Sequence, residues 1–349
     1  MPWAIVPTSL VSLTPVHPAA HQGLLGKWHK PGKGVAYRNV PRPVSINRFA
    51  PVYHNGITQF ETQFDRGPGR RSQIVGKSGW HDDKLRKVTK FPEIMQKAAL
   101  VTGSAIRLGK AFMLSLAEAG YHIALHYNSS ADAARSAQAE AQALGVECEL
   151  FPFNLLEEPD MTPLIEKVRS RFPGLNVLVN SASVYDAAPI LDTDPTLFQK
   201  QFKVNFEAPY FLTQAFAKLT DGGCVINIID NKVAFNQYQY AAYLLSKKAL
   251  QEFTKLAAVE LAPKVRVNGI APGVTLPMGS RTSDYIQWRI EGIPVKRQGT
   301  PENLCQALHY ILENEFVNGQ ILMVDGGEGL TNVGQNAEEY QKQTQIKQS

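Results

Sequence analysis

The chain has 349 residues, of which 44% are hydrophobic, so it can bury a sizeable core and is not disordered as a whole. Its formal net charge of +5 is uneven, because residues 1–95 carry 14 Lys and Arg against 5 Asp and Glu, whereas residues 96–349 carry 22 against 26. The larger part lacks a basic excess, and no apolar run approaches the roughly 18 residues of a membrane span, so neither nucleic acid nor membrane is an expected partner.

Proline and glycine interrupt residues 1–95 frequently, no acidic residue precedes Glu61, and no apolar period is sustained there. Such a segment is not expected to bury enough surface to offset the entropy lost on ordering. Three interpretations compete: a disordered leader, an organelle-targeting peptide, and a stretch translated in error ahead of a true start at Met95. We favour the last, because Met95 lies just before the first strand of the core.

From Lys97 onward, short apolar runs alternate with segments of helical periodicity. The runs predict strands at Ala98–Val101, His122–Tyr127, Cys148–Phe153, Val177–Asn180, Val225–Ile229, Val265–Ile270 and Ile321–Val324. The periodic segments predict helices at Lys110–Ala119, Ala131–Leu144, Met161–Phe172, Thr196–Leu219, Ala241–Leu261 and Pro301–Glu313. This alternation predicts an α/β fold: a Rossmann-like, doubly wound, parallel seven-stranded sheet with helices on both faces. We expect a single domain at residues 96–330 and a flexible tail at 331–349.

The first strand leads into a glycine-containing turn, Thr102-Gly103-x-x-x-Arg107-Leu108-Gly109. Gly103 permits a tight turn and Gly109 permits close packing of the following helix, whose N-terminus can then hold the pyrophosphate of a dinucleotide. Arg107 occupies the middle place of the glycine pattern. There it brings a permanent cation with five hydrogen-bond donors to the phosphates and the reacting centre.

The end of the second strand determines which dinucleotide is favoured. An acidic residue there would bind the ribose hydroxyls of NAD and repel a 2′-phosphate. The sequence instead has the neutral donors Asn128, Ser129 and Ser130. NADPH is therefore the predicted cofactor.

The three cysteines, Cys148, Cys224 and Cys305, are odd in number and lie far apart. They form no Cys-x-x-Cys motif and accompany no paired histidines, so no metal site is predicted. We interpret them as reduced, structural thiols of a cytoplasmic protein.

Tyr243 and Lys247 stand four residues apart in a segment that is predicted to be helical, which places an ammonium beside a phenol. A nearby cation is expected to lower the pKa of Tyr243 and make it a usable proton donor near neutral pH. Thirteen residues upstream of Tyr243, where a hydroxyl would be the ordinary companion, the chain has the carboxylate of Asp230. These three residues are the predicted catalytic centre.

With these features, residues 97–330 resemble the short-chain dehydrogenase/reductase superfamily. Four further landmarks support the resemblance: Asn180-Ser181-Ala182-Ser183 after the fourth strand, Asn205, Pro272-Gly273, and Asp325-Gly326-Gly327. The resemblance implies that Asn180, Ala182, Pro272 and Gly273 lie near the cofactor. It also implies that Lys247 binds the nicotinamide ribose, that Asn205 helps hold a proton relay with Tyr243 and Lys247, and that the protein forms homotetramers.

Within the superfamily the chain resembles the pteridine reductases, a pattern that dihydromonapterin reductases share. Three departures carry this: Arg107, Ser183 where glycine is common, and Asp230 in place of serine. The resemblance implies that Arg107 contacts both cofactor phosphate and pterin, and that Tyr185 stacks on the pterin. Two positions at the expected cofactor site depart from the branch. Asn154 stands where the family often has an aspartate near adenine, and Leu155, the next residue, is also expected to bind the cofactor. Ser129 stands where the family commonly has an arginine that binds phosphate.

The predicted reaction is NADPH-dependent hydride transfer to a C=N bond of a pterin, in which Tyr243 and Asp230 deliver protons to ring nitrogens. We expect the pKa of Asp230 to be raised beside a low-dielectric pocket. A carbonyl reductase of the same fold, acting on an oxoacyl thioester, a quinone or a sugar ketone, is the alternative. A non-enzymatic NADP-binding module is a third reading, which the intact set of Asn205, Tyr243 and Lys247 disfavours. The segment Val274–Arg297, which would cover the substrate, carries no readable specificity signal.

Overall fold

The computed structural model describes residues 52–54, 57–59, 96–276, 282–331 and 340. The chain divides into two units, Met1–Asp83 and Lys84–Ser349. In the first, β1 (Val52–His54) and β2 (Ile57–Gln59) pair in antiparallel fashion. The predicted start at Met95, most of the predicted leader and nearly all of the predicted tail lie outside the described residues.

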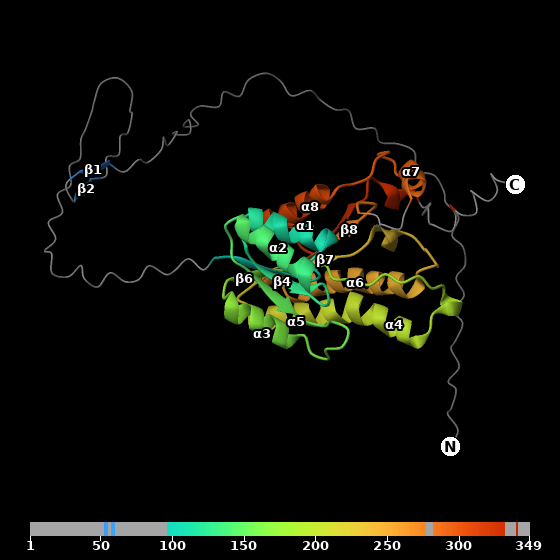
Figure 1. The fold of residues 1–349 in the computed structure, drawn as a ribbon, viewed down its shortest axis with the longest axis horizontal. Helices are drawn as coiled ribbons and strands as arrows, with labels where there is room; N and C mark the ends of the chain where they lie inside the picture. The colour runs from blue at the N-terminus through green and yellow to red at the C-terminus, as the bar shows by residue number, and fades with distance from the viewer. Residues whose placement is uncertain (1–51, 55–56, 60–95, 277–281, 332–339, 341–349) are drawn as a thin grey trace, which may run out of the picture. The chain divides into compact units, whose positions relative to one another are not determined.

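The second unit is built on the predicted seven-stranded parallel sheet (Figure 1). Its strands are β3 (Ala98–Val101), β4 (His122–Tyr127), β5 (Cys148–Pro152), β6 (Leu175–Asn180), β7 (Gly223–Ile228), β8 (Val265–Pro272) and β9 (Ile321–Val324). Their order in the sheet is β5-β4-β3-β6-β7-β8-β9. All seven strands were predicted, with ends that differ by two residues at most, so the Rossmann-like fold is confirmed.

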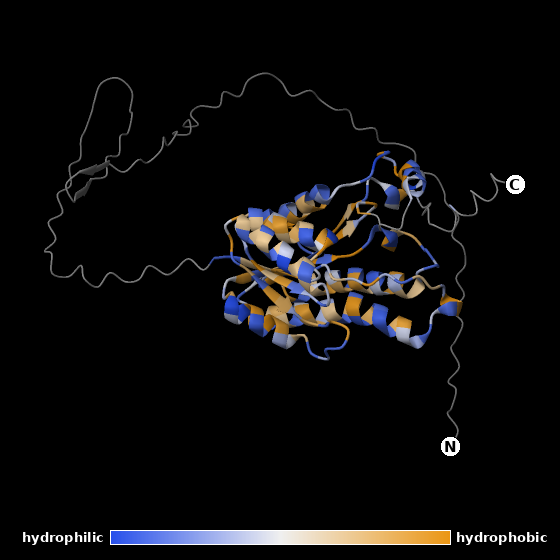
Figure 2. Ribbon diagram, viewed as in Figure 1, coloured by the Kyte–Doolittle hydropathy of each residue, from blue (hydrophilic) through white to orange (hydrophobic). Residues whose placement is uncertain are grey.

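Two apolar layers lie on opposite faces of the sheet, because successive side chains of a strand point to opposite sides. On β3, Ala99 and Val101 pack in one layer with α1 (Arg107–Glu118), α2 (Ala131–Ala143) and α8 (Pro301–Glu313). The neighbouring Ala98 and Leu100 pack in the other layer with helices α3 (Thr162–Arg171), α5 (Ala208–Leu219) and α6 (Ala241–Glu260). Figure 2 shows apolar residues along the strands and the adjoining sides of these helices. Among the described residues, no helix combines the length and the apolar character needed to cross a bilayer.

The helix predicted at Thr196–Leu219 is interrupted. It consists of α4 (Pro195–Phe202), the π-helical segment η3 (Lys203–Glu207) and α5. Pro209 explains the interruption, because proline has no N–H to donate to the carbonyl four residues earlier. That carbonyl belongs to Asn205, so the irregular turn lies at a predicted catalytic residue, as π-helical turns often do.

The α-helix α7 (Ser283–Glu291) lies within the segment Val274–Arg297 and was not predicted. Thr282 caps it by accepting a hydrogen bond from the backbone N–H of Tyr285 at 3.2 Å. Its buried positions are Tyr285 and Arg289, one turn apart. A charged residue at a buried position hides the apolar period by which a helix is recognised in sequence.

Candidate active site

A cavity of about 770 Å³ opens at the carboxyl ends of the parallel strands, where open α/β sheets bind their ligands. Two stretches of its lining come from the ends of β3 and β4, and others follow β6, β7 and β8. Most of the predicted site residues line it: Gly103, Arg107, Leu108, Gly109, Asn128, Ser129, Ser130, Asn154, Leu155, Ala182, Ser183, Tyr185, Asp230, Tyr243, Lys247, Pro272 and Gly273. The predicted residues Asn180 and Asn205 do not.

The glycine turn is as tight as predicted. Gly103 has a φ of +65°, and a Cβ atom on it would lie 2.9 Å from Cα of Ala182. A Cβ atom on Gly109 would lie 2.3 Å from the carbonyl oxygen of Gly103, so α1 approaches the turn closely. No side chain caps the first turn of α1 and no acidic residue lies in it. This helix N-terminus therefore suits an anionic phosphate.

His126 supports this turn and was not predicted. The backbone N–H of Gly103 donates to its Nδ1 at 3.0 Å, which places the ring proton on Nε2, 3.0 Å from the carbonyl oxygen of Phe153. Burial lowers the pKa of His126 to about 4, although the bond to Phe153 opposes the shift. The neutral His126 side chain thus connects the turn at Gly103 to the end of β5 through two hydrogen bonds. His126 lies inside an apolar run that predicts a strand, so no sequence pattern marked it as a residue of the site.

Arg107 opens α1 with a φ of +54°, a left-handed conformation that favours glycine. Arg107 stands where the superfamily pattern has a glycine. Its backbone keeps the conformation that favours glycine, and the position also carries a guanidinium side chain. The guanidinium is exposed, and Nη2 donates to the carbonyl oxygen of Leu276 at 2.5 Å. Arg107 therefore reaches from the phosphate end of the cavity to the segment that follows β8.

The far end of the cavity carries neutral polar groups. Asn128 and Ser129 are exposed, and Ser130 immediately precedes α2. Asn154 turns its Oδ1 to accept from the backbone N–H of Leu156 at 3.0 Å. Among the cavity-lining residues that the structure describes, Asp230 is the only carboxylate, and it follows β7, three strands away from β4 in the sheet. This absence of negative charge suits a cofactor with a 2′-phosphate.

Asp230 and Tyr243 form a direct hydrogen bond. Asp230 follows β7 and caps η4 (Asn231–Ala234), with Oδ1 accepting from the backbone N–H of Lys232 at 2.9 Å. Its Oδ2 accepts from the hydroxyl of Tyr243 at 2.6 Å. Lys247 is buried and donates to the carbonyl oxygen of Ile228 at 2.9 Å. The predicted catalytic trio therefore meets at one point, where β7 ends against α6.

The predicted direction of the Tyr243 pKa is wrong. Burial raises it well above 10.0, and the negative charge of Asp230 and the hydrogen bond to Asp230 raise it further. The Lys247 ammonium lies 5.9 Å from the centre of the Tyr243 ring, farther than the carboxylate oxygen is from the hydroxyl. Burial lowers the pKa of Lys247 to about 8, with Asp230 opposing the shift. Tyr243 is held as a protonated donor.

Asn205 and Asn180 support the cavity from behind. Oδ1 of Asn205 accepts from the hydroxyl of Ser183 and from the backbone N–H of Val184, each at 2.9 Å. Asn205 thus fixes the segment after β6, and its part in a proton relay with Tyr243 and Lys247 stays a prediction. Asn180 is buried and donates to Oδ1 of Asn227 at 2.8 Å, and its place near the cofactor stays a prediction.

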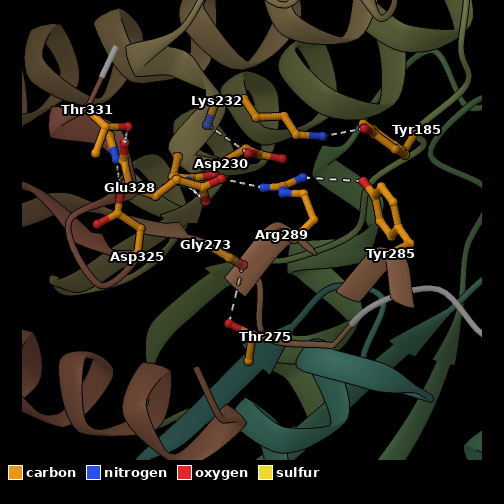
Figure 3. A network of polar contacts seen from close by, with 12 residues as sticks. Tyr185, Asp230, Lys232, Gly273, Thr275, Tyr285, Arg289, Asp325, Glu328 and Thr331 are labelled. Carbon is orange, nitrogen blue, oxygen red and sulfur yellow. Dashed lines mark hydrogen bonds and ion pairs between the residues drawn. The ribbon is translucent and has the colours of Figure 1, made fainter. Parts of the chain in front are cut away.

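Tyr185 is held on several sides. Its ring stacks on that of Tyr240 with centres 4.2 Å apart and planes 9° apart, and it meets the Tyr243 ring edge-on at 4.6 Å. The Lys232 ammonium donates to its hydroxyl (Figure 3). Burial raises the pKa of Tyr185, and so do Tyr240 and Asp230. Tyr240 thus covers one face of the Tyr185 ring, and this contact was not predicted.

The chain is similar to known proteins in sequence and in fold. A family model described as enoyl-(acyl carrier protein) reductase matches residues 103–328. The uncharacterized oxidoreductase YohF of Escherichia coli is 31% identical over 70% of this chain and all of its own, and the 3-oxoacyl-(acyl-carrier-protein) reductase FabG of Staphylococcus epidermidis is 29% identical over 67% of this chain and 99% of its own. The crystal structure of FolM alternative dihydrofolate reductase 1 from Brucella suis with NADP superposes with a TM-score of 0.65. It is 30% identical and covers 70% of this chain and 99% of its own.

Proposed function

This chain belongs to the short-chain dehydrogenase/reductase superfamily, and on that premise we propose that it uses NADPH to reduce the C=N bond of a pterin. The substrate class is a dihydropterin that becomes a tetrahydropterin, with dihydromonapterin and dihydrofolate included. One observation carries the proposal. The hydroxyl of Tyr243 donates to a carboxylate, Asp230, that lines the cavity.

A carboxyl group suits a nitrogen substrate better than a serine does. Serine donates a weak hydrogen bond that polarises a carbonyl oxygen, whereas a carboxyl group can give a full proton to a basic ring nitrogen. Asp230 Oδ2 accepts from the Tyr243 hydroxyl at 2.6 Å, so the carboxylate takes up a proton from water before it passes one to the ring nitrogen. The reaction needs one proton for each hydride, and this pair supplies it.

The residues of the cavity fit the cofactor. The turn at Gly103 and the uncapped N-terminus of α1 would hold the pyrophosphate, and Ser129 would lie at the 2′-phosphate. Lys247 would hold the nicotinamide ribose beside Pro272 and Gly273. When bound, NADPH supplies the hydride that the substrate carbon accepts.

The substrate would be oriented by an aromatic platform and a cation. Tyr185 is fixed between Tyr240, Tyr243 and Lys232, so its ring is ordered before a ligand arrives. A flat heterocycle gains from stacking on such a ring. Arg107 and Ser183 would add hydrogen bonds at the edge of the heterocycle.

Similarity to FolM alternative dihydrofolate reductase 1 of Brucella suis supports the proposal, because that protein is named for the reduction of a pterin-containing substrate. The test is NADPH oxidation at 340 nm with purified protein and a panel of substrates: dihydrobiopterin, dihydromonapterin, dihydrofolate, a 3-oxoacyl thioester, a quinone and a diketone. We expect turnover with at least one dihydropterin at a kcat/KM above that for every ketone. Turnover of ketones alone would overturn the proposal.

The second candidate is carbonyl reduction. It is favoured by similarity to FabG, named as a 3-oxoacyl reductase, and to acetoin dehydrogenase YohF of Salmonella typhimurium, which is 30% identical with a TM-score of 0.63. In this reading Tyr243 protonates a carbonyl oxygen, and Asp230 has no substrate contact. The ketones in the panel decide between the two.

We also propose that residues 96–330 form the reductase domain of a cytoplasmic homotetramer. Apolar side chains at Phe198, Phe211 and Leu245, on α4, α5 and α6, are about half exposed in the single chain. Packing of these helices against another copy would cover them. Sedimentation velocity is expected to give a species four times the mass of the chain, and a monomer would contradict this.

A further inference from the structure

A buried ion pair joins two segments that lie far apart in sequence, α7 and the short helix η5 (Glu328–Leu330). Nη2 of Arg289 lies 2.5 Å from Oε1 of Glu328, and the two side chains are 8% and 1% exposed. Arg289 belongs to the cavity lining together with Tyr285 of the same helix. Figure 3 shows the guanidinium between the Glu328 carboxylate and the Tyr285 hydroxyl.

The other oxygen of Glu328 reaches the proton-transfer loop. Oε2 accepts from Nδ2 of Asn231 at 2.8 Å, and Asn231 is buried. Asn231 directly follows Asp230 and begins η4. One carboxylate therefore holds both the helix that lines the substrate pocket and the loop that carries Asp230.

The Glu328 carboxylate is itself placed by its surroundings. Asp325 accepts from the backbone N–H groups of Gly327 and Gly329 at 2.9 and 2.7 Å, which folds the chain after β9 into a tight turn. The hydroxyl of Thr331 donates to the carbonyl oxygen of Glu328 at 2.8 Å. The Glu328 carboxylate is thus held in place, and its hydrogen bonds to Arg289 and Asn231 orient α7 and η4.

Stability alone does not explain the pair. Two buried charges lose their hydration, and replacing such a pair by neutral residues is often neutral or stabilising. The arrangement is also incomplete, because Nε of Arg289 is buried without a hydrogen-bond partner among the described residues. Directional, charge-assisted bonds do, however, fix geometry more strictly than apolar contacts.

We propose that Asn231, Glu328 and Arg289 are positioning residues that set Asp230 and the pocket wall of α7 in register through one buried carboxylate. The inference rests on the proposed function in one respect, the role of Asp230 in proton transfer. It predicts that the two bonds of Glu328 serve different steps. The bond to Asn231 serves the chemical step, and the bond to Arg289 serves substrate binding.

Two variants separate these effects. Asn231→Ala removes the link to the Asp230 loop and keeps the ion pair. The double variant Arg289→Met with Glu328→Gln removes both charges, so no unpaired charge stays buried, and it keeps an acceptor for Asn231. Thr331→Val is the matched control, because it removes a hydrogen bond to the backbone of Glu328 and leaves the carboxylate untouched. Thermal unfolding and NADPH affinity establish that each variant is folded.

For Asn231→Ala we expect kcat for the dihydropterin to fall about tenfold or more, with KM within about threefold of wild type. For the double variant we expect KM to rise about tenfold with kcat within about threefold. Thr331→Val is expected to match wild type in both. A kcat for Asn231→Ala within twofold of wild type, or equal changes of kcat and KM in both variants, would overturn the inference.

The failure of the proposed function is recognised separately. If wild type reduces ketones and no dihydropterin, the proposed function is wrong, and the same variants are measured on the best ketone. A selective loss of kcat in Asn231→Ala would then still support positioning of the Asp230 and Tyr243 pair. Unchanged kcat on that ketone would overturn the positioning as well.

Discussion

The two ends of the cavity differ in the chemical groups that line them. At the proposed cofactor end, the turn at Gly103, the start of α1 and the residues Asn128 and Ser129 present backbone groups and neutral side chains. At the proposed reaction end, Asp230, Tyr243 and Lys247 bring ionisable side chains close together. Binding at the first end depends on the path of the backbone. Chemistry at the second end depends on the contacts between particular side chains. Substitutions at the two ends should therefore fail in different ways.

The largest effect is expected for Tyr243→Phe. It removes the proposed proton donor and keeps the ring that packs against Tyr185. We expect kcat to fall about 10²- to 10⁴-fold, the usual contribution of a positioned acid, with NADPH affinity unchanged. Steady-state kinetics and fluorescence titration with NADPH measure the two quantities. A loss of affinity as large as the loss of kcat would show that the two ends are not separable.

The buried Lys247 gives the reaction end a pH-dependent stability. Its folded pKa of about 8 lies below its unfolded value, so the unfolded chain binds the extra proton between these values and stability rises with pH there. From pH 7 to pH 10 the free energy of unfolding of wild type should gain about 2 kcal/mol relative to Lys247→Met. Above pH 10 the raised pKa of Tyr243 acts in the opposite sense in both proteins, because the unfolded chain then loses the tyrosine proton first.

Urea denaturation of wild type and Lys247→Met at several pH values measures this difference. The comparison between the two proteins cancels the contributions of other groups. A difference that stays constant from pH 7 to pH 10 would mean that Lys247 keeps its ordinary pKa in the folded protein.

At the cofactor end, Ser129→Asp tests the choice of dinucleotide. Ser129 is exposed, so the substitution should leave the stability of the fold unchanged. A carboxylate there should repel a 2′-phosphate and weaken NADPH binding about tenfold, equal to about 1.4 kcal/mol, while NADH binding holds or improves. Isothermal titration with both dinucleotides checks this, and equal weakening of both would exclude a 2′-phosphate at Ser129.

The smallest change is expected for Arg107→Gly. The glycine relieves a left-handed φ of +54°, and this gain offsets the lost hydrogen bond to Leu276. The unfolding free energy should therefore stay within about 1 kcal/mol of wild type. The KM for the dihydropterin should rise about fivefold, because the substrate loses a cationic donor. Unaltered KM would limit Arg107 to a structural contact.

This contrast also explains what the sequence allowed us to predict. The strands, the turn at Gly103 and the pair of Tyr243 and Lys247 follow from local patterns and spacing. Asp230 was singled out through the family resemblance, and the structure brings it to Tyr243. The predicted direction of the Tyr243 pKa shift was wrong. That direction depends on burial of the side chain and on its hydrogen bond to Asp230, 13 residues earlier in the chain.

The parts that were missed depend on longer-range pairing. Glu328 and Arg289 are 39 residues apart, and Asn231 and Glu328 are 97 apart, so no local pattern links them. His126 joins two strand ends from inside an apolar run. The interruption at η3 follows from Pro209, a signal that the sequence did contain and that the helical period obscured.

The role of Asp230 is tested most directly by the ratio of kcat/KM for a dihydropterin to kcat/KM for a ketone, measured with NADPH in wild type and in Asp230→Ser. We expect the ratio to fall about 100-fold or more in Asp230→Ser, because a serine polarises a carbonyl oxygen and cannot give a full proton to a ring nitrogen. An unchanged ratio would contradict the assignment of Asp230 as the group that selects a nitrogen heterocycle.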